Sequence, residues 1–179
     1  MVVSIAEILE RKIIGNRDFG EGEGLVEPEG AAIDIRIGEI WEMLPETEAF
    51  LKKKTRKSRE YKKVAEFIPG QDDSFTLQPN IYYQLTSVED FTMPADLVGR
   101  FIGRYNLLVN GIMILGYKMD PGYKGKISVP IVNLSGVPFE LELGCRYSQS
   151  EFHRIDGESV KYRGQWGTRT FIAEEEIQV

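Results

Sequence analysis

Cysteine and histidine are almost absent from this chain of 179 residues, which contains one of each, Cys145 and His153. A single cysteine excludes an internal disulfide, and the two residues cannot form a His/Cys-ligated zinc site within one chain. Long apolar runs are missing too, since no stretch approaches the ~20 residues of a membrane span and the N-terminus lacks a signal-peptide core. These absences predict an intracellular, cytoplasmic protein without a membrane partner.

The overall composition is typical of a single globular domain. Hydrophobic residues make up 42% of the chain and charged residues 28%, and a chain of this length can bury a substantial core. We therefore expect one domain over residues 1–179.

The net charge of −6 conceals one strongly basic segment, residues 52–63 (KKKTRKSREYKK). This segment holds eight of the 22 basic residues and one acid, leaving 14 basic against 27 acidic residues elsewhere. A polyanion-binding patch and a solvated loop or short helix are both compatible with such a run. Because no nucleic-acid motif supports the first interpretation, we favour a solvated surface insertion and expect no nucleic-acid partner.

The N-terminal segment has the pattern of a short amphipathic helix. Ser4 and Glu7 form a capping box, and apolar residues recur at helical spacing as far as Ile13. Gly15 and Asn16 mark the expected end of the helix. The glycine-rich residues 20–30 then predict a loop.

From Ala31 onward the hydrophobic period changes to two, as half-buried strands require. Turn residues such as Pro121-Gly122 separate the successive candidates. The candidate strands are residues 33–37, 74–77, 81–87, 99–103, 111–117, 126–134, 139–143 and 147–155. Many short strands at close spacing predict an all-β barrel or jelly roll. The polar, glycine-rich tail from residue 157 lacks a core pattern and is expected to fold by docking.

The sequence Asp120-Pro-Gly-Tyr123 predicts a rigid hairpin between two strands. Pro121 presets φ for a tight turn, and Gly122 accepts the positive φ that the turn needs. Asp120 and Tyr123 are then fixed at the two shoulders of the turn. Most such turns are only structural, but a fixed carboxylate beside a flat ring also suits a nucleotide.

Further segments occur in a set order along the chain, and together they are similar to the dUTPase and dCTP deaminase superfamily, in particular its deaminase branch. The similarity covers nearly the whole chain. The matching segments are LVEP (25–28), AAIDIRIG (31–38), FTLQP (75–79), MPADLVGR (93–100), MDPGYKG (119–125), Gly144 followed by Gln149, and KYRGQWG (161–167).

The resemblance implies a dUTPase-like distorted β-barrel with a short N-terminal helix and an extended C-terminal tail, assembled as a homotrimer. Active sites would lie between subunits, and the tail, residues 157–179, would close over a neighbouring subunit's site. In the family's dUTPases the acid matching Asp120 is the general base. With Mg²⁺ as cofactor, it activates a water that attacks the α-phosphorus of dUTP, giving dUMP and pyrophosphate.

The resemblance also assigns substrate-binding residues. The ring matching Tyr123 packs on the deoxyribose, and Asp34 matches an acid that lies near the metal through water. A structural role for Asp34, paired with Arg36 or a loop amide, is an equal alternative. The candidate contacts to phosphate and to the rest of the nucleotide are Arg104, Asn106, Gln149, Lys161, Tyr162 and Gln165.

The second family motif is altered in this chain. Relatives usually carry a basic residue, Ser-Ser-Leu, a small residue, an arginine and then a glycine. Here Tyr105 and Asn106 replace the serines and Val109 replaces the arginine. Pro130 occupies the place where the deaminases need a glutamate, and it cannot transfer a proton. A proline there also predicts an edge strand or a bulge.

These departures argue against deamination and make dUTP hydrolysis the leading hypothesis. A dCTP deaminase or a bifunctional enzyme stays open as an alternative, as does a catalytically weak, nucleotide-binding regulatory trimer. A modified pyrimidine triphosphate as substrate would suit the reshaped second motif. His153 and Cys145 are interpreted as packing or surface residues.

Overall fold

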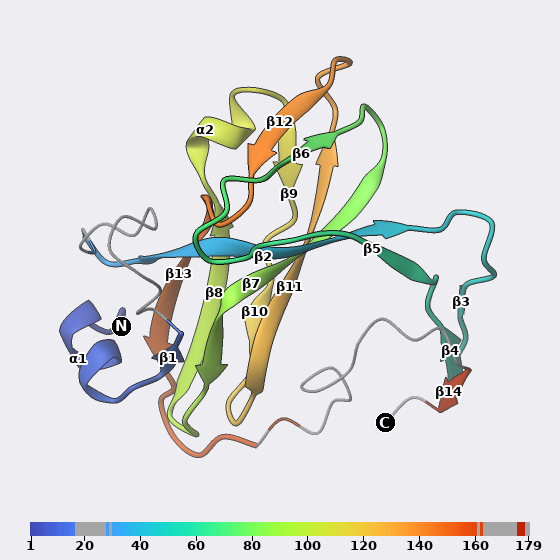
Figure 1. Ribbon diagram of the computed structural model, residues 1–179. Coiled ribbons are helices and arrows are strands. Elements are labelled where there is room, and N and C mark those ends of the chain that lie inside the picture. Colours follow the sequence, from blue (N-terminus) through green and yellow to red (C-terminus); the bar gives the residue numbers. More distant parts are fainter. Residues whose placement is uncertain (17–27, 29, 161, 163–174, 178–179) are drawn as a thin grey trace.

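The structure, a computed structural model, describes residues 1–16, 28, 30–160, 162 and 175–177. A curled antiparallel sheet of nine strands forms the body of the protein (Figure 1). Two short helices accompany it, α1 (Ile5–Glu10) and α2 (Tyr105–Leu108). The nine strands are β1 (Ile14–Gly15), β2 (Ile33–Met43), β5 (Tyr61–Glu66), β7 (Tyr82–Thr92), β8 (Leu97–Gly103), β9 (Ile112–Ile114), β10 (Lys118–Met119), β11 (Lys124–Asn133) and β13 (Arg146–Arg154).

The two ends of this sheet are joined by one short segment of chain. The strand order is β10-β8-β13-β2-β7-β11-β9, so β9 and β10 lie at opposite ends of the path. Only residues 115–117 separate them in sequence. Leu115 N donates to Pro130 O on β11 (3.0 Å), and Phe101 N on β8 donates to Tyr117 O (2.8 Å). The segment thus crosses from β11 to β8 and curls the sheet into the expected barrel-like, all-β architecture.

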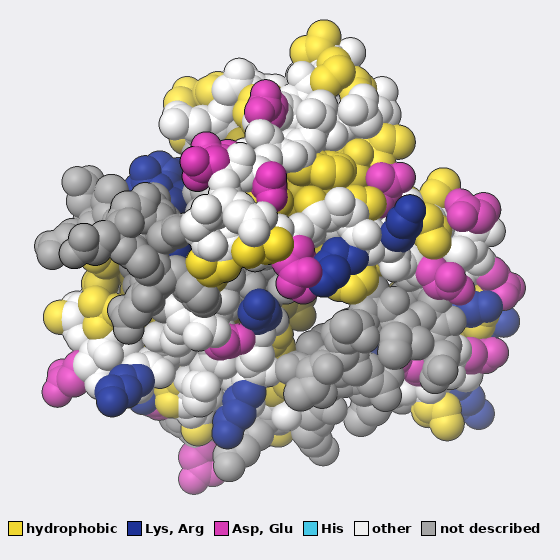
Figure 2. Space-filling view, viewed as in Figure 1, with side chains coloured by type: hydrophobic (Ala, Val, Ile, Leu, Met, Phe, Trp, Pro, Cys, Tyr) yellow, Lys and Arg dark blue, Asp and Glu magenta, His cyan; other side chains and the backbone are white. Residues whose placement is uncertain are grey.

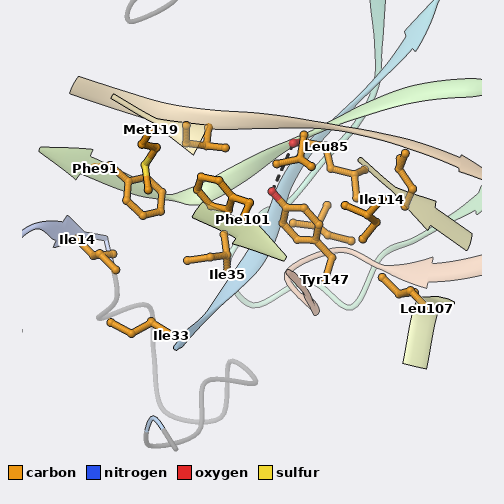
Figure 3. Packing of buried hydrophobic residues seen from close by; sticks show 14 of the residues in the cluster. Ile14, Ile33, Ile35, Leu85, Phe91, Phe101, Leu107, Ile114, Met119 and Tyr147 are labelled. Carbon is orange, nitrogen blue, oxygen red and sulfur yellow. Dashed lines mark hydrogen bonds between the residues drawn. The ribbon is translucent and has the colours of Figure 1, made fainter. Parts of the chain in front are cut away.

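Apolar side chains from the inner face of the sheet fill its interior (Figure 3). Ile35 and Leu85 are fully buried, and the rings of Phe91 and Phe101 pack edge to face with centroids 5.6 Å apart. The hydroxyl of buried Tyr147 donates to Leu85 O (3.4 Å). This packed interior fixes the strands, and therefore the positions of the side chains at the strand ends.

Two small sheets flank the main one. The first pairs β6 (Ser74–Leu77) with β12 (Phe139–Glu142), both close to the predicted ranges. The second contains β3 (Phe50–Leu51), β4 (Thr55–Lys57) and β14 (Glu176–Ile177). The basic run therefore lies on β4 and β5 and the turns beside them, and the expectation of a loop or short helix was wrong. Lysine is common on exposed edge strands because it hinders pairing with other chains.

The N-terminal helix is shorter than predicted. Ser4 Oγ accepts from Glu7 N (3.3 Å) at the N-cap, as the capping box requires. However, the helix ends at Glu10, and Lys12 adopts a left-handed φ of 50°. Ile13 and Ile14 are buried beyond the helix, where β1 pairs with β7. Burial of these two residues in the sheet overrides the helical spacing.

The far end of the tail docks on the same chain. Strand β14 pairs antiparallel with β4, and Arg56 Nη2 lies 3.2 Å from Glu176 Oε2. Neither helix of the described residues has the length and apolar character needed to cross a membrane.

Candidate functional site

The Asp120–Tyr123 hairpin adopts the predicted tight turn. Tyr123 N donates to Asp120 O (3.1 Å), and Gly122 has a φ of 80°, as the third residue of a type II turn requires. Met93 holds the turn from the side, because its carbonyl accepts from Gly122 N (3.1 Å) and its N–H donates to Tyr123 O (2.8 Å). The turn is therefore a rigid support for the two side chains at its shoulders.

The carboxylate of Asp120 is partly exposed and forms an ion pair. Lys118 Nζ lies 2.6 Å from Asp120 Oδ1, with 66% and 31% of the two side chains exposed. The hydrogen bond to this carboxylate raises the pKa of Lys118. Lys118 is a residue of this site that the sequence analysis did not identify.

Tyr123 is almost entirely buried, and its hydroxyl donates to Lys126 O. Burial raises the pKa of this phenol well above its usual range, so the hydroxyl stays protonated. The ring of Tyr162 packs against it edge to face, with centroids 5.7 Å apart. Tyr162 N also donates to Pro121 O (2.8 Å). The start of the tail thus lies against the ring that the resemblance assigns to the sugar.

A second group of polar side chains gathers where β2 and β13 meet the end of β8. Asp34 Oδ1 lies 3.1 Å from Arg104 Nη1, and Asp34 Oδ2 lies 2.9 Å from Arg146 Nη1. Gln149 faces Asp34 across the β2–β13 ladder. Among the described residues, two guanidinium groups share this one carboxylate, so the cluster as described carries a positive charge and suits an anion.

The contacts of Asp34 favour its structural role but with different partners. The predicted pairing with Arg36 was wrong, because Arg36 Nε binds Glu89 Oε1 (2.8 Å) in the interior. Two arginines on one carboxylate also disfavour a neighbouring cation. Among the described residues no cluster of three His, Cys, Asp or Glu side chains could hold a metal. A Mg²⁺ ion held by the described residues would therefore need substrate oxygens and water among its ligands.

The remaining predicted contacts are divided between the described and undescribed parts of the chain. Asn106 lies exposed on α2, two residues after Arg104. Lys161 and Gln165 lie outside the described residues, so their roles stay predictions.

The two groups of candidate residues lie at opposite ends of β8. Met119, next to Asp120, pairs with Gly99, whereas Arg104 follows the last residue of the same strand. Five residues of strand separate these points, or about 17 Å at the usual rise. Figure 1 shows α2 and the hairpin between β10 and β11 at opposite ends of the sheet. One chain alone therefore does not bring Asp120 to the arginine cluster.

Pro130 lies on β11 at the point where pairing with β9 stops. Its ladder partner on β7 is Gln84, and pairing with β9 begins at Ile131. β11 is not an edge strand, however, because it pairs with both β7 and β9, and Pro130 O accepts from Leu115 N (3.0 Å) beyond the end of β9. The prediction of an edge strand at Pro130 was therefore wrong. The irregularity of the β7–β11 ladder lies between Lys126 and Ser128, where the extra residues belong to β7, so the predicted bulge at Pro130 was wrong too.

Cys145 and His153, which the sequence suggested were packing or surface residues, do not form a catalytic group with other described residues. Burial raises the pKa of the Cys145 thiol to about 11, which makes it a poor nucleophile. His153 has a partner acid, since its Nε2 lies 2.9 Å from Glu151 Oε1. In the described residues no nucleophile bonds to this pair, and the backbone of Val2 pairs with that of His153 in an isolated β-bridge.

The fold and the site define the chain as a curled all-β barrel-like protein with a rigid Asp-Pro-Gly-Tyr hairpin and a separate arginine cluster. Residues 4–155 match the dCTP deaminase-like family. The chain belongs to this family, which confirms the resemblance seen in the sequence.

Relatives with different activities are similar to this chain. It is 29% identical over 137 residues to a "Probable deoxyuridine 5'-triphosphate nucleotidohydrolase" of Methanopyrus kandleri, covering 76% of this chain and 85% of that protein. It is also 29% identical over 111 residues to a dCTP deaminase of Idiomarina loihiensis, covering 56% of this chain and 57% of that protein.

The fold is similar to that of a solved dCTP deaminase from Agrobacterium tumefaciens, with a TM-score of 0.60 and 16% identity. That comparison covers 87% of this chain but 48% of the solved chain. The chain thus spans about half the length of this structure and of the Idiomarina relative. Family membership places the chain in pyrimidine nucleotide metabolism, and both hydrolysis and deamination occur among its relatives.

Proposed function

We propose that this protein hydrolyses dUTP to dUMP and pyrophosphate, with Asp120 as the general base. The rigid hairpin that presents a partly exposed Asp120 beside Tyr123 is the observation that carries the proposal. Pro130 on the next strand supports hydrolysis over deamination, because no acid occupies that position. The similarity to the Methanopyrus protein over 76% of the chain supports the same substrate.

In this reaction a water oxygen bonds to the α-phosphorus while the bond from that phosphorus to the bridging oxygen breaks. Asp120 takes the proton from the water, and pyrophosphate leaves. Tyr123 would pack on the deoxyribose through its ring once Tyr162, which packs against that ring in this structure, moves aside. Mg²⁺, if required, would offset the phosphate charge.

We also propose that the site is completed by a second copy of the chain, within a homotrimer. Asp120 would come from one copy, and Arg104, Arg146 and Gln149 from another. The surface next to Arg104 suits such a contact, because large apolar side chains there are exposed. These side chains are Tyr105 (75% exposed), Leu108 (43%), Val109 (57%), Met113 (42%) and Leu115 (47%).

Apolar area of this kind is usually covered in an assembly. Figure 2 shows hydrophobic side chains on the upper part of the molecule, the end at which Figure 1 places α2. In the same proposal, the tail from residue 157 closes over a neighbouring copy's site, with Tyr162, Lys161 and Gln165 near the nucleotide. Tyr162 and β14 contact their own chain in this structure, so the tail would exchange these contacts for ones on the neighbouring copy.

The direct test is to incubate the purified protein with dUTP or dCTP, with and without Mg²⁺, and to separate the products by chromatography. We expect dUMP from dUTP, and no product from dCTP. Formation of dUTP or dUMP from dCTP would contradict the role given to Pro130. Binding of either nucleotide without turnover would favour a regulatory trimer, which the exposed Tyr105 and Val109 of the altered motif would suit.

Shared sites predict that two inactive variants restore each other. Asp120→Asn and Arg104→Gln should each be inactive alone. In mixed oligomers from equal amounts, about a quarter of sites combine an intact Asp120 with an intact Arg104, so about a quarter of the activity should return. Activity after co-refolding measures this, and a mixture of Asp120→Asn with Asp120→Ala is the control. Mixed oligomers without recovered activity would show that each site lies within one copy.

A further inference from the structure

The proposed base is not free in this structure, because Lys118 occupies one of its oxygens at 2.6 Å. Lys118 and Asp120 are two residues apart at the end of β10, so their side chains point to the same face of the sheet. A carboxylate oxygen that accepts from an ammonium group is less able to accept a proton from water. The reaction therefore needs a step in which Lys118 leaves the Asp120 carboxylate, so that this oxygen can accept the proton of the water.

The surroundings make Lys118 easy to detach from Asp120. Both side chains are substantially exposed, and exposed ion pairs contribute little to stability. Arg100 lies directly opposite Lys118 in the β8–β10 ladder, and like charges in that position repel each other. The described partner of Arg100 is Glu151, at 4.0 Å. Glu151 in turn bonds to His153. Two cations thus lie side by side next to the base.

The geometry of the proposed reaction brings the α-phosphate to the same place. A water that donates to Asp120 while attacking phosphorus joins the two groups by two short contacts, so the phosphate lies within about 6 Å of the carboxylate. Lys118 Nζ is already at hydrogen-bonding distance from that carboxylate. Its flexible four-carbon stem lets the ammonium group move between the two anions.

We propose that Lys118 is a substrate-binding residue that exchanges Asp120 for the incoming triphosphate and thereby frees the base. The inference rests on the proposed function and deepens it. The triphosphate carries several negative charges against the single charge of Asp120, so it is the stronger partner for the ammonium group. The carboxylate becomes free when the substrate arrives, and the water is activated beside the phosphorus that it attacks.

The test compares Lys118→Met with Lys124→Met, a control at an exposed lysine on the opposite strand of the same hairpin. For Lys118→Met we expect KM for dUTP to rise about tenfold or more, as loss of a charge-assisted hydrogen bond predicts, with kcat no lower than about half the wild-type value. Lys118→Arg should restore most of the affinity. Lys124→Met should leave both constants unchanged.

A fall in kcat at unchanged KM would overturn the inference, because Lys118 would then only position Asp120. Unchanged constants in Lys118→Met would overturn it as well. Calorimetric binding of a non-hydrolysable α,β-imido dUTP gives a readout that does not need turnover. If Lys118→Met and the wild-type protein bind this analogue with equal affinity, the role of Lys118 is overturned, but the proposed hydrolysis of dUTP is not. A wild-type protein that binds no triphosphate would overturn both this inference and the proposed function.

Discussion

Replacing Asp120 with asparagine is expected to lower the rate of dUTP hydrolysis by about a thousandfold, within the range that a general base contributes. The amide has nearly the shape of the carboxylate but cannot accept the proton of the attacking water. The turn itself is held by main-chain bonds from Tyr123 and Met93, which the substitution leaves in place. Steady-state rates on dUTP, with sedimentation to check assembly, measure the effect.

The matched control is Asp72→Asn, because Asp72 is an exposed acid outside the candidate site. This variant should retain wild-type rates. The thermal midpoint of Asp120→Asn should stay close to that of the wild-type protein, since the Lys118 ion pair is exposed. If Asp120→Asn turned over dUTP at the wild-type rate, Asp120 would have only a structural role in the turn, and the proposed mechanism would be wrong.

The parts of the fold that follow from local pattern could be predicted from the sequence. Alternation of apolar and polar residues located eight of the strands, and the strand predicted at 74–77 coincides with β6. However, β2 and β7 continue six and five residues past their predicted ends, and β1, β3, β4, β5, β10 and β14 were not predicted. The hairpin was predictable because Pro121 and Gly122 each satisfy one backbone requirement of the turn. These features depend only on residues that are near one another in sequence, so a local sequence pattern can predict them.

Arg146 shows what the pattern could not reveal. A period of two places Arg146 and Gln149 on opposite faces of a strand, so the sequence does not predict that both side chains lie near Asp34. In the structure, a bulge between Arg146 and Ser148 inserts one residue against β2. This extra residue brings Arg146 to the face of Gln149, where it reaches Asp34 at 2.9 Å. The partner of Asp34 was therefore misassigned because a bulge has no reliable signature in sequence.

The basic run was misread for a related reason. Its charges predicted a solvated segment, and the charges are indeed at the surface. However, β5 takes its strand geometry from pairing with β2, which lies far away in sequence. Long-range pairing of this kind decides between loop and strand where local composition does not.

The interior ion pair between Arg36 and Glu89 leads to the second large expected effect. Both side chains have no exposed area, and Arg36 Nε lies 2.8 Å from Glu89 Oε1. Arg36 N also donates to Glu89 Oε2 (3.0 Å), and Arg36 Nη2 donates to Asn16 O (3.0 Å). The pair therefore ties β2, the strand that also carries Asp34, to β7 and to the residue after β1.

Replacing Glu89 with leucine is expected to destabilise the protein by about 3–5 kcal/mol, because it removes the buried carboxylate that Arg36 Nε and Arg36 N contact. For a chain of this size the thermal midpoint should fall by about 6–20 °C. Calorimetry or thermal denaturation followed by circular dichroism measures the change. Lys63→Met is the comparison, since Lys63 lies 2.6 Å from Glu66 but the pair is exposed, and its midpoint should barely move.

The double variant Arg36→Met/Glu89→Leu separates the cost of losing the carboxylate from the loss of packing. With both charges removed, most of the lost stability should return, because well-packed apolar residues can replace a buried ion pair. Recovery should stay incomplete, since Arg36 N and Asn16 O each lose a hydrogen-bond partner. A double variant as unstable as Glu89→Leu would show that the pair acts through its hydrogen-bonding geometry and not through its charge balance. A stable Glu89→Leu variant would mean that water reaches Arg36, contrary to its burial in this structure.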